Sequence, residues 1–255
     1  MIKRIVGCSL KELSNARYNL EPYILDFANF KCATNQLILE VGIGAGADFE
    51  QWCCYSTHAT GVDFTDSAVS LTSERLRINS TPSHRYTLVT ADAEKLPFAE
   101  NSFDIVYSWG VLHHTPDTRR AFLEAYRVLK PGGVLKAMIY HHPSWTGLML
   151  YFQYAVARVN FRRSMREIIF EHLESPGTKL YTTSETEALL KGVGFSKIKL
   201  LTRLGPGDLL LSKPSKKYRK SIYRALWRFH PRWLVRMLGH RYGLELLITA
   251  AKPTS

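Results

Sequence analysis

Residues Leu37–Gly46 read LILEVGIGAG, and this stretch decides the fold. An apolar, β-rich run leads directly into three glycines at alternate positions, Gly42, Gly44 and Gly46, and then into a segment predicted to be helical. Glycine permits positive φ and lets a ligand approach the backbone, while the helix offers free N–H groups and the positive end of its dipole. The spacing is GxGxG, whereas dinucleotide enzymes seat a pyrophosphate with GxGxxG, so hydride transfer is disfavoured.

Further short β-rich runs follow the first one, and segments typical of helices separate them. This alternation predicts a doubly wound α/β fold with a seven-stranded, mainly parallel sheet covered on both faces. Two helices have clear boundaries: glycines follow Asp117–Leu129, and a capping box opens Ser184–Lys191. The predicted strands are Leu37–Val41, Thr60–Asp63, Tyr86–Thr90, Phe103–Ser108, Gly133–Tyr140, Phe195–Leu201 and Tyr242–Ala251.

The formal charge of +12 is concentrated late in the chain. From Lys213 onward, eleven basic side chains stand against a single acid, Glu245, which gives +10 and leaves +2 for everything before it. The four cysteines have no metal-ligand spacing, so we expect reduced, structural thiols. The N-terminal apolar run is interrupted at Lys11 and is too short for a secretory signal or a membrane span. We therefore expect a cytoplasmic protein.

Two acids lie where the second and third strands end. Asp63 ends the second strand, about 20 residues past the first glycine, where a carboxylate can accept both hydroxyls of a ribose. Asp92 follows the third strand, where it can accept from an exocyclic adenine amine. Two acids facing a nucleoside at one edge of a sheet predict a purine-riboside pocket. Taken alone, each acid has a plainer interpretation as a turn residue. Glu40 has no such plain interpretation, because burying an unpaired carboxylate in an apolar strand costs free energy of folding.

Four blocks in this order resemble the class I S-adenosylmethionine-dependent methyltransferases, in particular the branch that contains the ubiquinone and menaquinone enzymes. They are the glycine motif, Gly61–Phe64, Asp92–Phe98 and Phe103–Gly133, and the resemblance covers residues 37–140. It implies a Rossmann-like class I fold and S-adenosylmethionine as cofactor. It also implies that the methionine moiety lies by Glu40 and Gly42, the ribose by Asp63, the adenine by Phe64, Asp92 and Ala93, and the sulfonium by Trp109 and Gly110.

Methyl transfer from a sulfonium is an in-line displacement, so the enzyme mainly aligns donor and acceptor and excludes water. His113 and His114 follow the fourth strand, and His141 and His142 follow the fifth, all at the carboxyl edge of the sheet. Histidine is the natural general base near neutral pH, so these four are the candidate catalytic residues. The alternative is that they are ordinary hydrogen-bonded loop residues. We expect no metal site, since adjacent residues on an extended chain point apart and no carboxylate completes a ligand set.

Two stretches interrupt the alternation and are predicted to be insertions in a single domain of residues 1–255. Residues 145–175 place a helical region after the fifth strand, and residues 203–241 separate the sixth strand from the last. In the class I strand order, the chain leaves both strands on the ligand side of the sheet. We therefore expect the insertions to form a helical lid, and we expect Pro231 to divide the second into two helices.

Both insertions combine arginines with aromatic residues. Basic amphipathic helices of this kind lie on anionic membrane surfaces. A solvated cap whose aromatic residues cover the substrate is the alternative, and nucleic-acid binding ranks third because no RNA-binding module accompanies the charge. The arginines are Arg158, Arg162, Arg163 and Arg166 in the first insertion and Arg224, Arg228, Arg232 and Arg236, every fourth residue, in the second.

These features predict a methyltransferase that acts on a hydrophobic, amphiphilic or anionic small molecule, with oxygen favoured as the acceptor atom. The enzyme is also expected to associate peripherally with the inner membrane surface. The alternatives are an RNA or protein methyltransferase and a noncatalytic S-adenosylmethionine-fold binding module. The intact glycine motif and both acids argue against the last.

Overall fold

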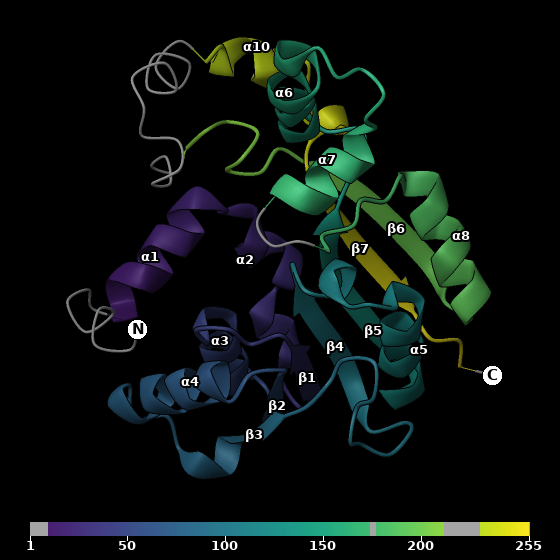
Figure 1. The fold of residues 1–255 in the computed structure, drawn as a ribbon. Coiled ribbons are helices and arrows are strands. Elements are labelled where there is room, and N and C mark those ends of the chain that lie inside the picture. The colour runs from purple at the N-terminus through teal and green to yellow at the C-terminus, as the bar shows by residue number, and fades with distance from the viewer. Residues whose placement is uncertain (1–9, 174–176, 212–229, 255) are drawn as a thin grey trace. The chain divides into compact units, whose positions relative to one another are not determined.

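The computed structural model describes residues 10–173, 177–211 and 230–254. Within them a seven-stranded sheet has the order β3-β2-β1-β4-β5-β7-β6 (Figure 1). β1 pairs in parallel with both β2 and β4, β2 with β3, and β4 with β5. The strand order reverses between β1 and β4, and ligands of such sheets bind at the carboxyl ends there. The strands are β1 (Leu37–Val41), β2 (His58–Asp63), β3 (Tyr86–Thr90), β4 (Phe103–Trp109), β5 (Leu129–Tyr140), β6 (Ser196–Arg203) and β7 (Glu245–Ala251).

β7 runs against β5. The N–H of Gly132 donates to the carbonyl of Lys252, and at the other end of the strand the N–H of His141 donates to the carbonyl of Leu244. Because β5 and β7 are antiparallel while the pairs among β1 to β5 are parallel, the sheet is mainly rather than wholly parallel. The predicted fold class is confirmed. β5 begins at Leu129, earlier than predicted, because Leu129 already pairs with Phe103 and a register irregularity accommodates the residues that follow.

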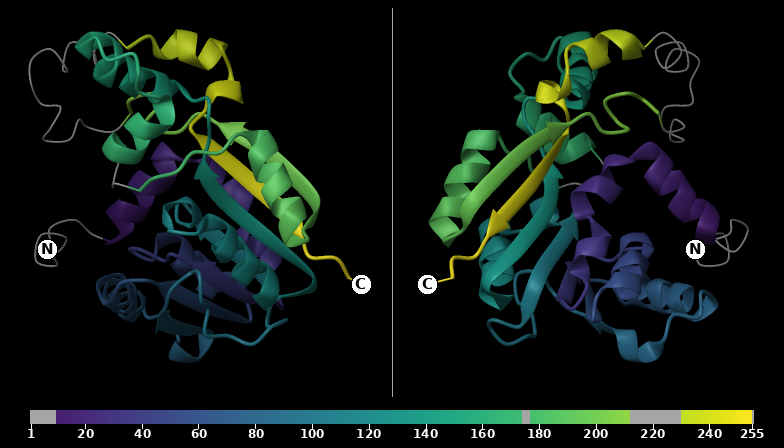
Figure 2. Two further views of the ribbon diagram at one scale, coloured as in Figure 1. Left: turned by 45° about the vertical axis from the view of Figure 1, so that its right-hand side comes forward. Right: turned by 180° about the vertical axis from the view of Figure 1, so that it is seen from behind.

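The helices cover both faces of the sheet, and α8 begins at Thr183, so Ser184 lies inside the helix that it was predicted to cap. The Asp117 side chain accepts a 3.0 Å hydrogen bond from the N–H of Arg120 and so caps α5. α3 and α4 lie on one face, and α5 and α8 lie on the other (Figures 1 and 2). The helices here are α1 (Leu10–Leu20), α2 (Tyr23–Ala28), α3 (Ala47–Tyr55), α4 (Asp66–Ile78), α5 (Thr118–Val128) and α8 (Thr183–Val193), with short 3-10 turns η2 (Phe30–Ala33), η3 (Ser83–Arg85) and η4 (Leu112–His114).

The core under α3 and α4 is aromatic at its centre. The rings of Phe30 and Trp52 meet edge to face with centroids 4.5 Å apart, and Trp52 and Tyr107 do so at 5.3 Å. Ile38 and Ile105 from the two central strands complete the cluster. Edge-to-face pairs add to the stability gained from burial. This core fixes the carboxyl ends of β1 and β4, where the predicted site lies.

The chain divides into two compact units. The first contains residues 1–139, 184–200 and 247–255, and the second contains residues 140–183 and 201–246. Both predicted insertions fall within the second unit. Its elements are α6 (Trp145–Tyr154), η5 (Val156–Arg158), α7 (Met165–His172), α10 (Arg232–Met237) and η7 (His240–Tyr242). A helix after Pro231 was predicted and is confirmed as α10, whereas the helix predicted before Pro231 lies outside the described residues.

Asp208 organises the second unit. Its buried carboxylate accepts from the N–H and the hydroxyl of Thr146 (both 2.8 Å), from the N–H of Gly205 (3.0 Å) and from the N–H of Leu244 (2.7 Å). These bonds join the start of α6 to the segments that leave β6 and enter β7. Trp145 packs beside the buried side chains of Leu204, Leu209 and Val235. The two insertions therefore share one small core.

Candidate functional site

The three glycines after β1 form the turn that the sequence predicts. Gly42, Gly44 and Gly46 have φ of 85°, 51° and 75°, in the left-handed region that favours glycine. A Cβ on Gly42 would lie 2.1 Å from the Val111 side chain, and one on Gly46 would lie 2.8 Å from Thr72, whereas the corresponding side of Gly44 is open. The turn thus combines close packing at its ends with free space at its centre, where a ligand can approach the backbone.

Asp63 holds this turn in place. One carboxylate oxygen accepts a 3.1 Å hydrogen bond from the N–H of Gly44, and the other accepts from the N–H and hydroxyl of Thr65, both at 3.0 Å. Phe64, the next residue, leaves 75% of its surface exposed and is available for packing against a ligand. The end of β2 is therefore joined to the glycine turn, as a shared nucleoside site requires.

The turn after β3 lies beside Asp63. The N–H of Ala91 donates to the backbone carbonyl of Asp63 at 2.9 Å, which places the Asp92 turn next to the end of β2. The Asp92 side chain accepts from the N–H of Glu94 at 2.9 Å, and Ala93 is buried. The structure thus brings the glycines, Asp63 and Asp92 together at one edge of the sheet.

Trp109 ends β4 at the same edge, and Gly110 follows it. Gly110 has a φ of 73° and donates its N–H to the carbonyl of Met138 on β5. The Trp109 ring lies near the rings of Phe27 (centroids 5.8 Å apart), Tyr23 (6.2 Å) and Tyr107 (6.4 Å). Residues of α2, far away in sequence, therefore supply an aromatic wall beside the end of β4.

A buried charge cluster behind this wall was not anticipated from the sequence. Asp48, near the start of α3, accepts from the Arg17 guanidinium at 3.0 and 2.6 Å, from the Tyr18 hydroxyl at 3.0 Å and from the Tyr107 hydroxyl at 2.9 Å. Burial raises the pKa of both tyrosines, and the charge of Asp48 raises it further, so neither serves as a base near neutral pH. The position of Asp48, two residues after Gly46, is the one sequence feature that could have pointed to it. No local pattern in the sequence indicates that its partners lie on α1.

Glu40 lies next to this cluster with one carboxylate oxygen unsatisfied. Its side chain is 3% exposed, and Oε2 has no hydrogen-bond partner among the described residues. Burial raises the pKa of Glu40 well above its usual range, and the charge of Asp48 acts in the same direction, while Arg17 opposes both. An orphaned, buried acceptor favours a ligand that brings a cation or an N–H donor. The residues present therefore fit the ammonium-bearing end of S-adenosylmethionine.

The four candidate histidines fall in the two units, one pair in each. In the first unit, the rings of His113 and His114 lie 4.1 Å apart in η4, and His113 is fully buried. In the second unit, Nδ1 of His141 lies 3.1 Å from the carbonyl of Gly243, and burial lowers the pKa of this histidine. The N–H of His142 donates to the carbonyl of Tyr181. A catalytic role for any of the four stays a prediction.

In residues 10–173, 177–211 and 230–254, no three or more His, Cys, Asp or Glu side chains are grouped so that they could hold a metal ion. Over the same residues, no helix is long and apolar enough to cross a membrane.

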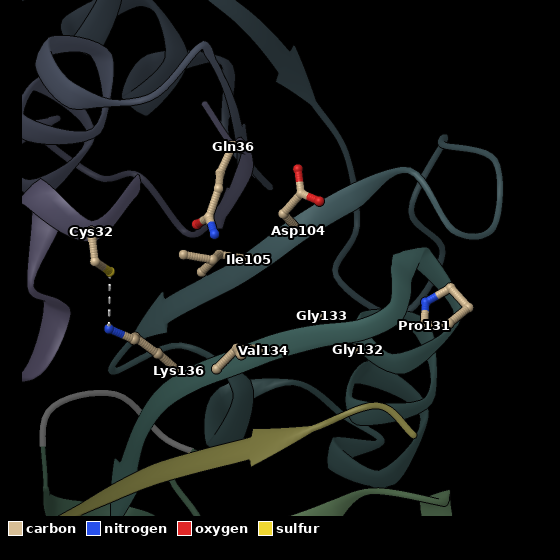
Figure 3. Close-up of a pocket in the computed structure, with 9 residues that line it drawn as sticks. All are labelled: Cys32, Gln36, Asp104, Ile105, Pro131, Gly132, Gly133, Val134 and Lys136. Carbon is tan, nitrogen blue, oxygen red and sulfur yellow. Dashed lines mark hydrogen bonds between the residues drawn. The ribbon is translucent and has the colours of Figure 1, made fainter. Parts of the chain in front are cut away.

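A cavity of about 330 Å³ lies at a different edge (Figure 3). It is lined by residues that precede β1, by the first residues of β4 and by residues of β5 as far as Lys136 in the middle of that strand, whereas the predicted site lies at the carboxyl ends of the strands. At its rim the Lys136 ammonium donates to the carbonyls of Ala28 (2.6 Å) and Phe27 (3.2 Å), and its Nζ is 4.0 Å from the Cys32 sulfur. The lining residues are Cys32, Gln36, Asp104, Ile105, Val134, Lys136 and residues 131–133. This cavity is therefore separate from the predicted cofactor site.

Comparison with known proteins gives one family match and several relatives. Residues 39–137 match the family described as "Methyltransferase domain". The chain is 29% identical over 143 residues to phosphoethanolamine N-methyltransferase 2 of Caenorhabditis elegans, covering 56% of this chain and 32% of that one. It is 29% identical over 154 residues to the demethylmenaquinone methyltransferase of Listeria welshimeri, covering 58% and 64%. The chain thus spans between about a third and two thirds of these relatives.

Among solved structures, phosphoethanolamine N-methyltransferase 2 of Haemonchus contortus, in complex with S-adenosyl-L-methionine, superposes with a TM-score of 0.61. The sequence identity is 20%, and the match covers 92% of this chain and 52% of the other. At this identity the likeness concerns the fold.

Proposed function

We propose that this chain, whose residues 39–137 form a class I S-adenosylmethionine-dependent methyltransferase domain, methylates a hydrophobic or amphiphilic small molecule. The observation that carries the proposal is the joined edge of β1, β2 and β4, where an open glycine turn, two acids and an orphaned buried carboxylate meet. The likeness of the matched domain to two small-molecule methyltransferases supports the class of acceptor.

The cofactor, when bound, supplies the electrophilic methyl group, and the chain's residues hold it. Asp63 accepts from the ribose hydroxyls, and Asp92 with Ala93 contacts the adenine edge, against which Phe64 packs. Glu40 and Gly42 receive the methionine end, and Trp109 and Gly110 lie by the sulfonium. The glycine turn of Gly44 and Gly46 allows the close approach.

We favour oxygen as the acceptor atom and a histidine as the base. A hydroxyl loses its proton as the new bond forms, and a neutral imidazole accepts it near pH 7. His113 and His114 follow β4 and are the candidates in the first unit, while His141 and His142 follow β5 and belong to the second. Burial lowers the pKa of His141, so its imidazole is neutral near pH 7.

We propose that the helical regions of the second unit recruit this acceptor from an anionic membrane surface on the cytoplasmic side. Their arginines and aromatic side chains suit a molecule with an apolar body and a polar or anionic head.

The decisive experiment is incubation with methyl-labelled S-adenosylmethionine and a cell extract, followed by separation of lipid, small-molecule, RNA and protein fractions. We expect label in the lipid or small-molecule fraction. An Asp63→Ala variant is the matched control and should reduce the signal at limiting cofactor, because its cofactor affinity is lower. Label confined to RNA or protein would overturn the acceptor class, whereas no affinity for the cofactor by calorimetry would overturn the enzyme itself.

A further inference from the structure

The second unit carries almost all of the excess positive charge of the chain. Residues 140–183 and 201–246 contain sixteen lysines and arginines against five acids, a net charge of +11, and the remaining sequence has +1. Like-sign charge of this density attracts an anionic partner over several ångströms of solvent. The partner must therefore present negative charge.

A helical hairpin in this unit exposes large apolar side chains at its tip. α6 and α7 pack through the buried side chains of Tyr154, Ala155 and Ile168, and Ser164 caps α7 in a capping box with Glu167. Residues 155–164, the hairpin tip, connect the two helices. Near and within the tip, Phe152 is 63% exposed, Val159 79% and Phe161 62%. The hairpin is thus well fixed at its base and apolar at its end.

Arginines flank the apolar side chains of the hairpin tip. The Arg158 guanidinium lies over the Tyr154 ring, 4.8 Å from its centroid, which directs it along the end of α6. Arg162, beside Phe161, is exposed, and Arg163 is held by Glu171 at 2.6 Å. The tip therefore alternates cations with apolar groups over a few residues.

α10 presents the same combination beside α6 (Figures 1 and 2). Trp233 and Met237, one helical turn apart, are 69% and 68% exposed, while Val235 faces the shared core with Trp145. Arg236 stands exposed between them in sequence. Exposed apolar groups this large, interleaved with cations, mark a surface that meets a partner.

We propose that the hairpin tip and the exposed side of α10 dock the second unit onto an anionic lipid membrane. Val159, Phe161, Trp233 and Met237 enter the interfacial layer, and Arg158 and Arg162 contact headgroup phosphates. A nucleic acid would use the arginines but gains nothing from an exposed valine and methionine, so the apolar groups favour the membrane. The biological reason for this docking rests on the proposed function, in which the methyl acceptor is an amphiphilic molecule.

The test measures binding of the full chain to sedimented vesicles without cofactor or acceptor, so its failure and that of the proposed enzyme are separate results. Vesicles of phosphatidylcholine with phosphatidylglycerol should bind the protein, pure phosphatidylcholine should not, and salt should weaken binding. We expect Val159→Asn with Phe161→Ser to weaken binding by about tenfold or more, since the apolar contact is lost. Asn suits the left-handed backbone at Val159, so this variant keeps the fold. Replacing Arg158 and Arg162 by Gln should cost about fivefold for each charge.

Ile78→Ser, which removes an exposed apolar side chain of α4 in the first unit, is the matched control and should bind as the unchanged protein does. A blue shift of tryptophan fluorescence on vesicle addition, reduced in Trp233→Ser, would support insertion of α10. The proposal is overturned if the unchanged protein fails to bind anionic vesicles at low salt, or if the tip variant binds them equally well. Retention of tRNA with no vesicle binding would assign the surface to nucleic acid instead.

Discussion

Replacing Glu40 by Gln should stabilise the ligand-free protein and weaken cofactor binding. The carboxyl is 3% exposed, Oε2 has no hydrogen-bond partner among the described residues, and the facing charges include Asp48 on α3 and Asp63 on β2. Arg17 on α1 is the one cation among these named groups. The hydroxyl of Tyr107 on β4 donates its hydrogen bond to Asp48. Glutamine keeps the size of the side chain and removes the buried charge.

The sign of the pH dependence follows from the raised pKa of Glu40. In the unfolded chain the carboxyl loses its proton near its usual value of about 4.5, whereas in the folded protein it keeps the proton to a higher pH. The free energy of unfolding therefore falls as pH rises from about 4.5 through the raised folded pKa and is constant above it. Each unit of the rise removes about 1.4 kcal/mol.

At pH 8 the Gln variant should therefore unfold with a free energy about 1–3 kcal/mol higher than that of the unchanged protein, the usual penalty for an unsatisfied buried group. Urea unfolding between pH 5 and pH 9 measures the difference, which should shrink toward the acid end. Glu50→Gln is a contrasting control, because Glu50 pairs at 2.8 Å with Arg75, which is 1% exposed. Because the buried Arg75 loses its anionic partner, this variant should lower the free energy of unfolding by about 3 kcal/mol.

Cofactor affinity should move in the opposite direction. A cationic ligand end favours the ionised carboxylate, so binding should release a proton and strengthen as pH rises toward the folded pKa of Glu40. Calorimetry in buffers of different ionisation enthalpy measures the released proton, and the Gln variant should release none and bind about 10- to 100-fold more weakly. If the Gln variant is less stable than the unchanged protein without ligand at pH 8, the reasoning about the orphaned carboxylate is refuted.

Four other changes test the remaining parts of the site and the fold. Asp63→Ala should lower cofactor affinity by about 10- to 100-fold, measured by calorimetry, with the far-ultraviolet dichroism of the fold unchanged. Arg17→Ala should reduce the free energy of unfolding by about 2 kcal/mol, because Asp48 keeps its two tyrosine hydroxyls and the guanidinium is part-exposed; a loss below 0.5 kcal/mol would contradict a structural role for the pair. Asp208→Asn should cost about 3 kcal/mol, since the new NH₂ group meets backbone donors, and thermal unfolding measures the shift. His114→Ala should lower kcat by about 100-fold with cofactor affinity unchanged; an unchanged kcat would rule out His114 as the base.

Local patterns were sufficient for most of the fold. Alternating apolar runs and glycine signals placed the strands. The apolar spacing within Asp117–Leu129 and the glycines after it placed α5, which ends one residue earlier than predicted, at Val128, because such signals act within a few residues. The glycine turn and the positions of Asp63 and Asp92 followed from where strands end. The start of β5 was missed because pairing with Phe103, a long-range contact, extends the strand.

The sequence by itself determined the sheet, its glycine turn and the two acids, since each depends on neighbours along the chain. Tertiary structure alone decided the cluster around Asp48, whose bonds to Arg17 and Tyr107 span 31 and 59 residues, and the hub at Asp208, whose bond to Thr146 spans 62. The burial of Glu40 was expected from its place in an apolar strand, whereas its neighbour Asp48, which also raises its pKa, is known only from the folded chain. Side chains that meet across such distances leave no local pattern, and the site's electrostatics therefore belong to the fold.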